Sequence, residues 1–188
     1  CLIQNEESNA VIQRVKELFV QYDIKPYDKT THQGNIKHVL TKKGYHSEEF
    51  MLCFITYQKT IKHIDQIVET LVQEFPHIKT IIQNINERHD NVILGDEEKI
   101  LYGQGYIYDT LLKNQYKISL KSFYQINPIQ VEVLYQTAID LAHLNQDSVV
   151  LDAYCGIGTI TLSLAKHVKK VYGVEVVYQA IEDAKNNA

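Results

Sequence analysis

The sequence predicts an α/β protein with two parts, a central α+β domain over residues 1–118 and the start of a Rossmann-like fold over residues 119–188. Two observations support this two-part prediction. The first part mixes helical spacing with short apolar runs of strand length. The second part reads strand, glycine loop, helix, strand, acidic residue, helix, which is the opening of a doubly wound sheet. A hydrophobic fraction of 45% and a charged fraction of 22% are ordinary for a globular protein.

The first part is expected to open with an amphipathic helix at residues 8–22, where apolar side chains recur every three or four positions. Ser8 or Asn9 can cap it. Two strands, at residues 36–41 and 49–57, flank a turn. The second strand is apolar on both faces, which favours a central position in a sheet.

A second helix is expected at residues 61–75, ended by Pro76. Further strands are expected at residues 78–85, 92–94 and 105–112, with a loop over residues 95–103.

In the second part, Asn127 and Pro128 suit the N-cap and the first position of a helix. A buried strand over residues 149–151 and a strand over residues 171–174 follow, and each leads into a helix. Doubly wound sheets usually have more strands than these two. We therefore expect the chain to stop inside a fold and its open sheet to favour self-association.

Charge and cysteine content bound the class of protein. The net charge is −4, which argues against a surface that binds nucleic acid throughout but allows a local basic patch. Cys1, Cys53 and Cys155 show no metal-ligand spacing, so we expect a reducing, cytoplasmic setting without disulfides. No signal peptide or membrane-length apolar run is visible. Because the chain begins with Cys1 rather than Met, we expect its natural N-terminus to be missing.

The strongest motif runs from Asp152 to Thr159, where Gly156 and Gly158 follow a strand. Such glycines allow close approach of a ligand to the backbone. Glu175 ends the next strand and can accept hydrogen bonds from ribose hydroxyls. A dinucleotide site needs a third glycine where Thr161 stands, which favours a ligand without pyrophosphate, such as S-adenosylmethionine. The alternative is a plain turn in a protein that binds no nucleotide.

The second motif runs from Lys121 to Pro128. Phe123 and Tyr124 can stack on a base, and Gln125 can hydrogen-bond a cofactor or a uracil edge. Taken alone, the motif also fits a strand end followed by a capped helix.

Together, the segments 122–128, 151–159 and 173–175 resemble the family of RNA 5-methyluridine methyltransferases that act on 23S rRNA or on the tRNA T-loop. Residues 31–39 resemble the central domain of that family more loosely. The resemblance implies that Gln125, Tyr154 and Glu175 contact S-adenosylmethionine beside the glycine loop, and that Phe123 lies near the RNA base.

The same resemblance implies that the nucleophilic cysteine, the general base and a further cofactor-binding aspartate lie beyond residue 188, so no catalytic residue is assigned in this chain. The N-terminal β-barrel common in the family is also absent from it. Cys1 resembles the last ligand of an iron–sulfur cluster found in some members, and such a cluster is expected only in a longer protein.

Cys155 stands at the start of a helix, a position that lowers a thiol pKa and suits a nucleophile. The family pattern instead favours buried packing for Cys155, and Cys53 belongs to an apolar strand.

Basic side chains gather in the first hairpin, and the remaining histidines of the sequence show no metal-ligand spacing. The basic side chains can meet RNA phosphates or form a solvated face. These residues are Lys37, His38, Lys42, Lys43 and His46.

We therefore expect the full-length protein to methylate C5 of a uridine in structured RNA, 23S rRNA rather than tRNA. A cysteine thiolate would add to C6 of the uracil, and C5 would take the methyl group from the cofactor. A base would then remove the C5 proton, and the cysteine would leave C6. Two alternatives remain: a methyltransferase for DNA, protein or a small molecule, and a non-catalytic binding module.

Overall fold

The computed structural model describes residues 4–188 and divides them into two compact units. Cys1, and with it the resemblance to an iron–sulfur ligand, lies outside the described residues. The units meet in sequence between Tyr106 and Ile107, earlier than the expected boundary at residue 118. The turn Gly44–Glu48 belongs to the second unit, although it connects two strands of the first. The predicted α/β class is confirmed.

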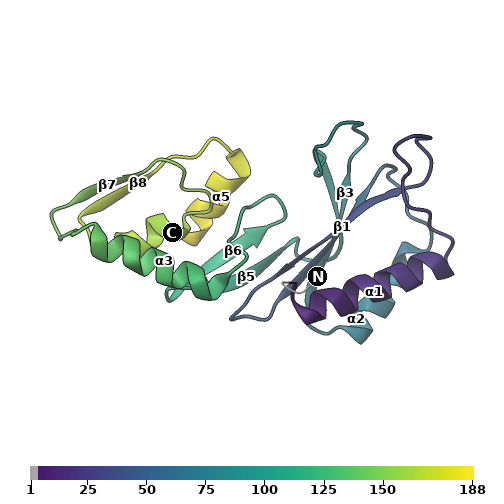
Figure 1. The fold of residues 1–188 in the computed structure, drawn as a ribbon, viewed down its shortest axis with the longest axis horizontal. Coiled ribbons are helices and arrows are strands. Elements are labelled where there is room, and N and C mark those ends of the chain that lie inside the picture. Colours follow the sequence, from purple (N-terminus) through teal and green to yellow (C-terminus); the bar gives the residue numbers. More distant parts are fainter. Residues whose placement is uncertain (1–3) are drawn as a thin grey trace. The chain divides into compact units, whose positions relative to one another are not determined.

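The first unit is a four-stranded sheet with two helices on one face (Figure 1). The strand order is β1-β2-β3-β4, with β2 and β3 parallel and the outer pairs antiparallel. Its elements are α1 (Glu6–Gln21), β1 (Ile36–Lys43), β2 (Phe50–Thr56), α2 (Ile64–Glu74), β3 (Ile78–Ile85) and β4 (Glu97–Gly103).

Strand β2 is central, as expected, and every residue in it is buried. Alternate side chains of β2, including Phe50 and Phe54, enter the core shared with α1 and α2. Phe54 meets Phe19 of α1 edge-on, with ring centroids 5.4 Å apart. This apolar layer fixes α1 and α2 on one face of the sheet.

Two predictions in this unit were wrong at element ends. Helix α1 begins at Glu6 rather than residue 8, because the side chain of Asn5 caps it by accepting from the Glu7 backbone N–H at 2.9 Å. Helix α2 begins at Ile64 rather than residue 61.

A third prediction was wrong along the fourth strand. Residues 92–94 are not a strand, because the Asn86 side-chain amide donates to the carbonyls of Val92 and Ile93 at 2.7 and 2.8 Å. The expected loop at 95–103 is instead mostly strand β4. This edge strand is largely exposed, so it lacks an apolar pattern that would reveal it.

The second unit combines a hairpin, a parallel strand pair and three helices. Helix α4 connects the parallel strands β7 and β8 and packs on β8, while α5 packs on β6 (Figure 1). Its elements are β5 (Tyr106–Leu111), β6 (Asn114–Ser119), α3 (Pro128–Leu141), β7 (Val149–Asp152), α4 (Thr159–Ala165), β8 (Lys170–Gly173) and α5 (Tyr178–Asn187).

Strand β6 was not predicted. It pairs with β5 across Leu112 and Lys113, whose φ angles of 47° and 67° are those of a tight hairpin turn. Glycine or asparagine usually marks such a turn, and neither residue occupies these two positions.

The expected burial of the strand at 149–151 was wrong at alternate positions. Val149 is 61% exposed and Leu151 is 64% exposed. No described element covers this row of β7 side chains, although parallel strands are usually covered on both faces. Among the helices of residues 4–188, none has both the length and the apolar character that a membrane crossing requires.

Candidate functional site

The glycine loop lies between β7 and α4. Gly158 is the N-cap of α4 with φ +85°, and Gly156 has φ +54°. These are left-handed conformations that favour glycine. A Cβ placed on Gly156 would meet no atom within 4 Å, so its backbone is open to a ligand. Tyr154, in the same loop, is 90% exposed. The loop therefore offers an open backbone surface beside a free aromatic ring.

Glu175 follows β8 and ties the glycine loop to the end of that strand. Its carboxylate accepts backbone N–H groups from Gly156 at 3.2 Å, Val176 at 2.7 Å and Val177 at 2.9 Å. These bonds lower the pKa of Glu175, and the bond from the Val177 N–H has the largest effect. Glu175 is therefore ionised at neutral pH. A carboxylate has about four acceptor sites. Two ribose hydroxyls would therefore have to share or displace a backbone donor.

The segment 122–128 is held at two points that lie on either side of Phe123. The Ser122 hydroxyl donates to buried Asp183 of α5 at 2.5 Å. The Tyr124 hydroxyl donates to Asp109 of β5 at 3.2 Å, and burial raises the pKa of Tyr124. Phe123 lies between these anchors and is 73% exposed. Because the side chains on either side of it point into the unit, the Phe123 ring faces solvent.

Asp109 organises a second segment as well as Tyr124. It is buried, and its carboxylate accepts the backbone N–H groups of Tyr45, His46 and Ser47 at 3.0, 2.9 and 3.2 Å. The sequence analysis missed this residue. The sequence does indicate it, because Asp109 is a charged residue at an inward position of β5, whose inward-facing neighbours are apolar.

Gln125, expected at the cofactor, is half-buried in the stretch before α3. Asn127 caps α3 as predicted, accepting the Gln130 backbone N–H at 3.1 Å. The structure thus places all of the cofactor and base candidates in the second unit: Phe123, Gln125, Tyr154, Gly156, Gly158 and Glu175.

The family model described as tRNA (Uracil-5-)-methyltransferase matches residues 45–188, which is most of the chain and nearly all of the second unit. The chain belongs to this family.

Curated relatives agree at the level of RNA methyltransferases. An uncharacterized RNA methyltransferase of Oceanobacillus iheyensis is 44% identical over 188 residues, which is all of this chain and 41% of the relative. One from Halalkalibacterium halodurans is 46% identical with the same coverage, and one from Streptococcus mutans is 47% identical over 99% of this chain. The chain spans about two-fifths of the length of these relatives.

A solved structure shows the same fold. The tRNA (uracil-54, C5)-methyltransferase of Pyrococcus abyssi, determined with S-adenosyl-L-homocysteine, matches with a TM-score of 0.80 and 24% identity. The match covers 97% of this chain and 44% of that enzyme.

Cys155 is packed rather than activated in this family member. Burial is the main cause that raises the pKa of the Cys155 thiol, and the negative charges of Asp152 and Glu175 add to it. The lowered pKa expected from the position of Cys155 at the start of a helix was therefore wrong. A Cβ on Gly173 would lie 3.0 Å from the Cys155 sulfur, which shows how closely the thiol packs on β8. Cys53 is also buried, and burial raises its pKa to about 12.

Two of the basic hairpin residues, Lys37 and Lys43, have partners elsewhere in the first unit. Lys43 is paired with Glu7 of α1 at 2.7 Å. Lys37 donates to the carbonyls of Asn86 and Arg88 at 3.0 and 2.5 Å. The other three residues divide between the units, with His38 and Lys42 on β1 and His46 in the turn of the second unit.

Proposed function

We propose that the protein containing this chain transfers a methyl group from S-adenosylmethionine to C5 of a uridine in RNA. The observation that carries the proposal is the combination in one compact unit of an open glycine loop, tied to Glu175, and a pinned segment that exposes Phe123. The first suits a nucleoside-containing cofactor, and the second suits an unstacked base.

The described residues fit this cofactor. S-adenosylmethionine supplies an electrophilic methyl group when bound. Gly156 leaves open space at the loop backbone, Tyr154 presents a ring for stacking, and ionised Glu175 can accept a ribose hydroxyl. Thr161 donates to Asp152 at 2.6 Å, so the position where a pyrophosphate site needs glycine is used for internal packing. Gln125 is proposed as a further cofactor contact.

We infer that the nucleophile is not Cys155. C5 of uracil attacks a methyl group only after a thiolate adds to C6, and a buried thiol with a raised pKa is a poor source of thiolate. The thiolate and the base that removes the C5 proton are proposed to come from other parts of the longer protein. Phe123 is proposed to hold the target base after it leaves its stack.

Our proposed substrate within RNA is 23S rRNA. The matching family and the Pyrococcus enzyme are both described as tRNA methyltransferases, which makes tRNA the second candidate.

The test uses the full-length protein with labelled S-adenosylmethionine and unmodified 23S rRNA and tRNA as separate substrates. Nucleoside analysis should find 5-methyluridine in one of them. Label that enters DNA, protein or a small molecule, but no uridine, would contradict the proposal. Cofactor binding without any transfer would favour a non-catalytic module.

A further inference from the structure

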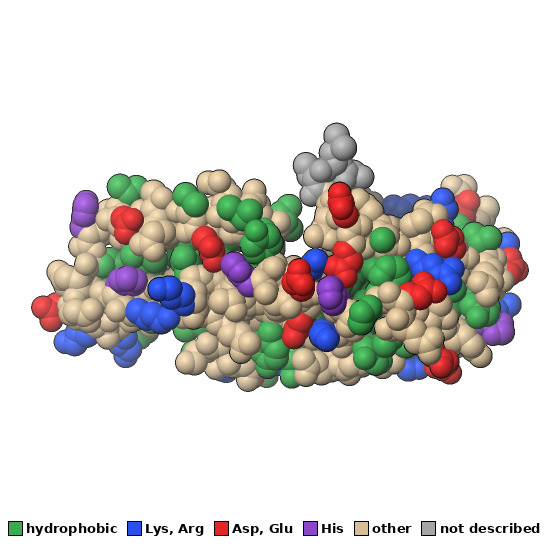
Figure 2. All heavy atoms as spheres, turned by 90° about the horizontal axis from the view of Figure 1, so that it is seen from below, with side chains coloured by type: hydrophobic (Ala, Val, Ile, Leu, Met, Phe, Trp, Pro, Cys, Tyr) green, Lys and Arg blue, Asp and Glu red, His purple; other side chains and the backbone are tan. Residues whose placement is uncertain are grey.

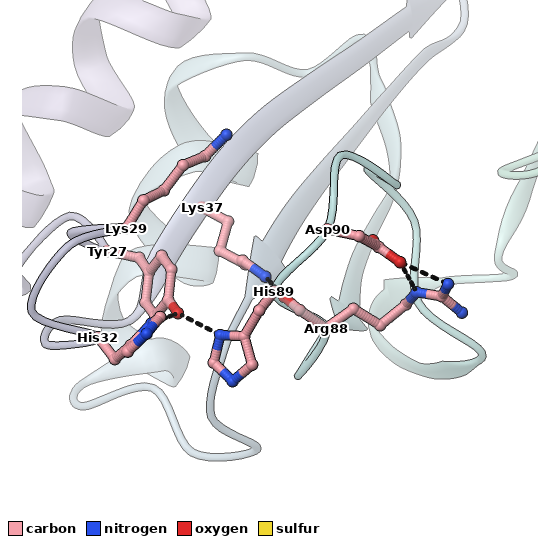
Figure 3. Close-up of a pocket in the computed structure, with 7 residues that line it drawn as sticks. All are labelled: Tyr27, Lys29, His32, Lys37, Arg88, His89 and Asp90. Carbon is pink, nitrogen blue, oxygen red and sulfur yellow. Dashed lines mark hydrogen bonds and ion pairs between the residues drawn. The ribbon is translucent and has the colours of Figure 1, made fainter.

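A pocket in the first unit collects side chains from three segments that are far apart in the sequence (Figure 3). They come from the loop after α1, from the start of β1 and from the loop between β3 and β4. The lining residues are Tyr27, Lys29, His32, Lys37, Arg88, His89 and Asp90.

The Tyr27 hydroxyl connects two histidines. The hydroxyl oxygen lies 2.7 Å from His32 Nδ1 and 3.1 Å from His89 Nδ1 (Figure 3). The centroids of the two imidazole rings are 4.3 Å apart. The hydroxyl has one proton, so it can donate to only one imidazole and must accept from the other. The accepting imidazole has Nε2–H, whereas the donating one, when neutral, has a lone pair at Nε2.

This arrangement can take up one proton without losing a hydrogen bond. Protonation at Nε2 of the donating imidazole keeps its Nδ1–H on Tyr27 and adds a second N–H. Protonation of both rings would leave the Tyr27 proton without an acceptor and place two charges 4.3 Å apart. One proton is therefore the natural limit of the pair.

The pocket is cationic although the chain is acidic. Lys29, Lys37 and Arg88 line it against one carboxylate, Asp90, whereas the whole chain carries −4. Asp90 is paired with Arg88 at 2.5 Å. On the right-hand part of the face shown in Figure 2, by contrast, acidic and basic side chains lie beside one another.

Lys37 is held in place between the ring walls and the backbone. Its Nζ lies 4.9 Å from the Tyr27 ring centroid and 5.8 Å from that of Tyr57, while it donates to two carbonyls. An ammonium has three protons, so two carbonyl bonds leave one N–H for a ligand. A fixed cation of this kind suits an anionic oxygen better than a mobile surface lysine does.

We propose that this pocket binds a phosphodiester group of the RNA substrate and that the His32–Tyr27–His89 group takes up one proton as the phosphate binds. The proposal rests on the proposed function in taking RNA as the ligand. A phosphate offers only acceptor oxygens, which match the N–H groups of the charged imidazole and of the three cations that line the pocket, Lys29, Lys37 and Arg88. Asp28 is the other carboxylate near His32, and its Oδ1 accepts the backbone N–H groups of Thr30 and Thr31.

The experiment measures binding of a fluorescent, uridine-containing RNA stem-loop to the full-length protein at pH 8 and pH 6. One linked proton changes affinity by up to about tenfold per pH unit, so binding by the unaltered protein should tighten by roughly tenfold on acidification. A double variant, His32→Asn with His89→Gln, should tighten by no more than about twofold.

The matched control is His143→Asn. His143 is exposed and has φ 47°, close to the 55° of His32, and asparagine tolerates this backbone region. The control should keep the pH dependence of the unaltered protein. Slow amide exchange in β2, which is buried in the same unit as His32 and His89, verifies that the double variant is folded.

A second measurement uses Lys29→Gln. Loss of one phosphate contact should lower the slope of log affinity against log salt by about 0.7–0.9. A double histidine variant with the full pH dependence, or an unchanged salt slope in Lys29→Gln, would overturn the proposal. Linked binding without uridine methylation would defeat the proposed function alone, and methylation without linkage would defeat the pocket alone.

Discussion

At the residue scale, Glu175 is the acid on which the cofactor proposal depends most. Glu175→Ala removes the ionised acceptor for ribose hydroxyls and also three backbone bonds, of which the one from Gly156 holds the glycine loop. We expect the affinity for S-adenosylmethionine to fall roughly tenfold or more. Calorimetry on the full-length protein measures this. An unchanged dissociation constant would mean that Glu175 stabilises the loop but does not contact the cofactor.

The pH dependence of cofactor binding is a separate test of Glu175. Its pKa lies below the ordinary glutamate value, so the carboxylate and its bonds are retained above that range and are lost only as pH falls through the lowered value. We therefore expect no change in cofactor affinity from this residue between pH 8 and pH 6. A loss of affinity across that interval that disappears in Glu175→Gln would contradict the prediction.

Cys155 gives the third residue-scale prediction. Because burial raises its pKa, the thiol should react slowly with iodoacetamide at pH 7.5 in the folded protein. Cys155→Ser should preserve most of the methyl transfer by the full-length enzyme, since serine changes the volume little. Loss of transfer with cofactor binding intact would make Cys155 the nucleophile after all.

At the element scale, Asp109 connects β5, the turn 44–48 and the segment that carries Phe123. Asp109→Ala leaves three backbone donors and one phenol without this acceptor. We expect a loss of about 2–3 kcal/mol in unfolding free energy. Tyr124→Phe, which removes only the 3.2 Å bond, should cost about 1 kcal/mol. Denaturant unfolding of both variants tests the order, and a larger loss in Tyr124→Phe would contradict it.

Elements with a strong local signal could be predicted from the sequence, and those defined by their partners could not. The apolar run of β2 and the Asn127–Pro128 start of α3 were predicted correctly because burial and capping leave direct marks in the sequence. Strand β4 is an exposed edge defined by pairing with β3, so it leaves no such mark.

The candidate site divides in the same way. The glycine loop and the acid after β8 follow a spacing rule, so the sequence was sufficient to propose them. The pocket around Tyr27 could not be predicted, because His32 and His89 are 57 positions apart and meet only through folding.

At the scale of the whole molecule, residues 1–188 alone are expected to bind the cofactor at most and to transfer no methyl group. The described thiols are both buried with raised pKa values, so residues 4–188 offer no ready thiolate for addition to C6. Incubation with labelled cofactor and uridine-containing RNA tests this. Reproducible formation of 5-methyluridine by the chain alone would show that its own residues complete the site.

The last prediction concerns the parallel pair β7 and β8. Val149, Leu151 and Tyr172 are all about half exposed or more, and strands with apolar exposed edges associate readily. The isolated chain should therefore bind a hydrophobic dye and self-associate with rising concentration. Amides of β7 should exchange with solvent faster than those of β2, which is buried throughout.

A matched variant separates association through this surface from association elsewhere. Val149→Thr with Leu151→Thr keeps β-branched or strand-compatible side chains while reducing the apolar area. We expect it to lower dye binding and to shift the chain toward monomer in sedimentation, since each apolar Å² removed from water contributes about 25 cal/mol. Val20→Thr, at a 75% exposed position of α1, should change neither. If the double variant associates as strongly as the original chain, β7 is not the interface. Val149 and Leu151 would then remain exposed to solvent without causing association.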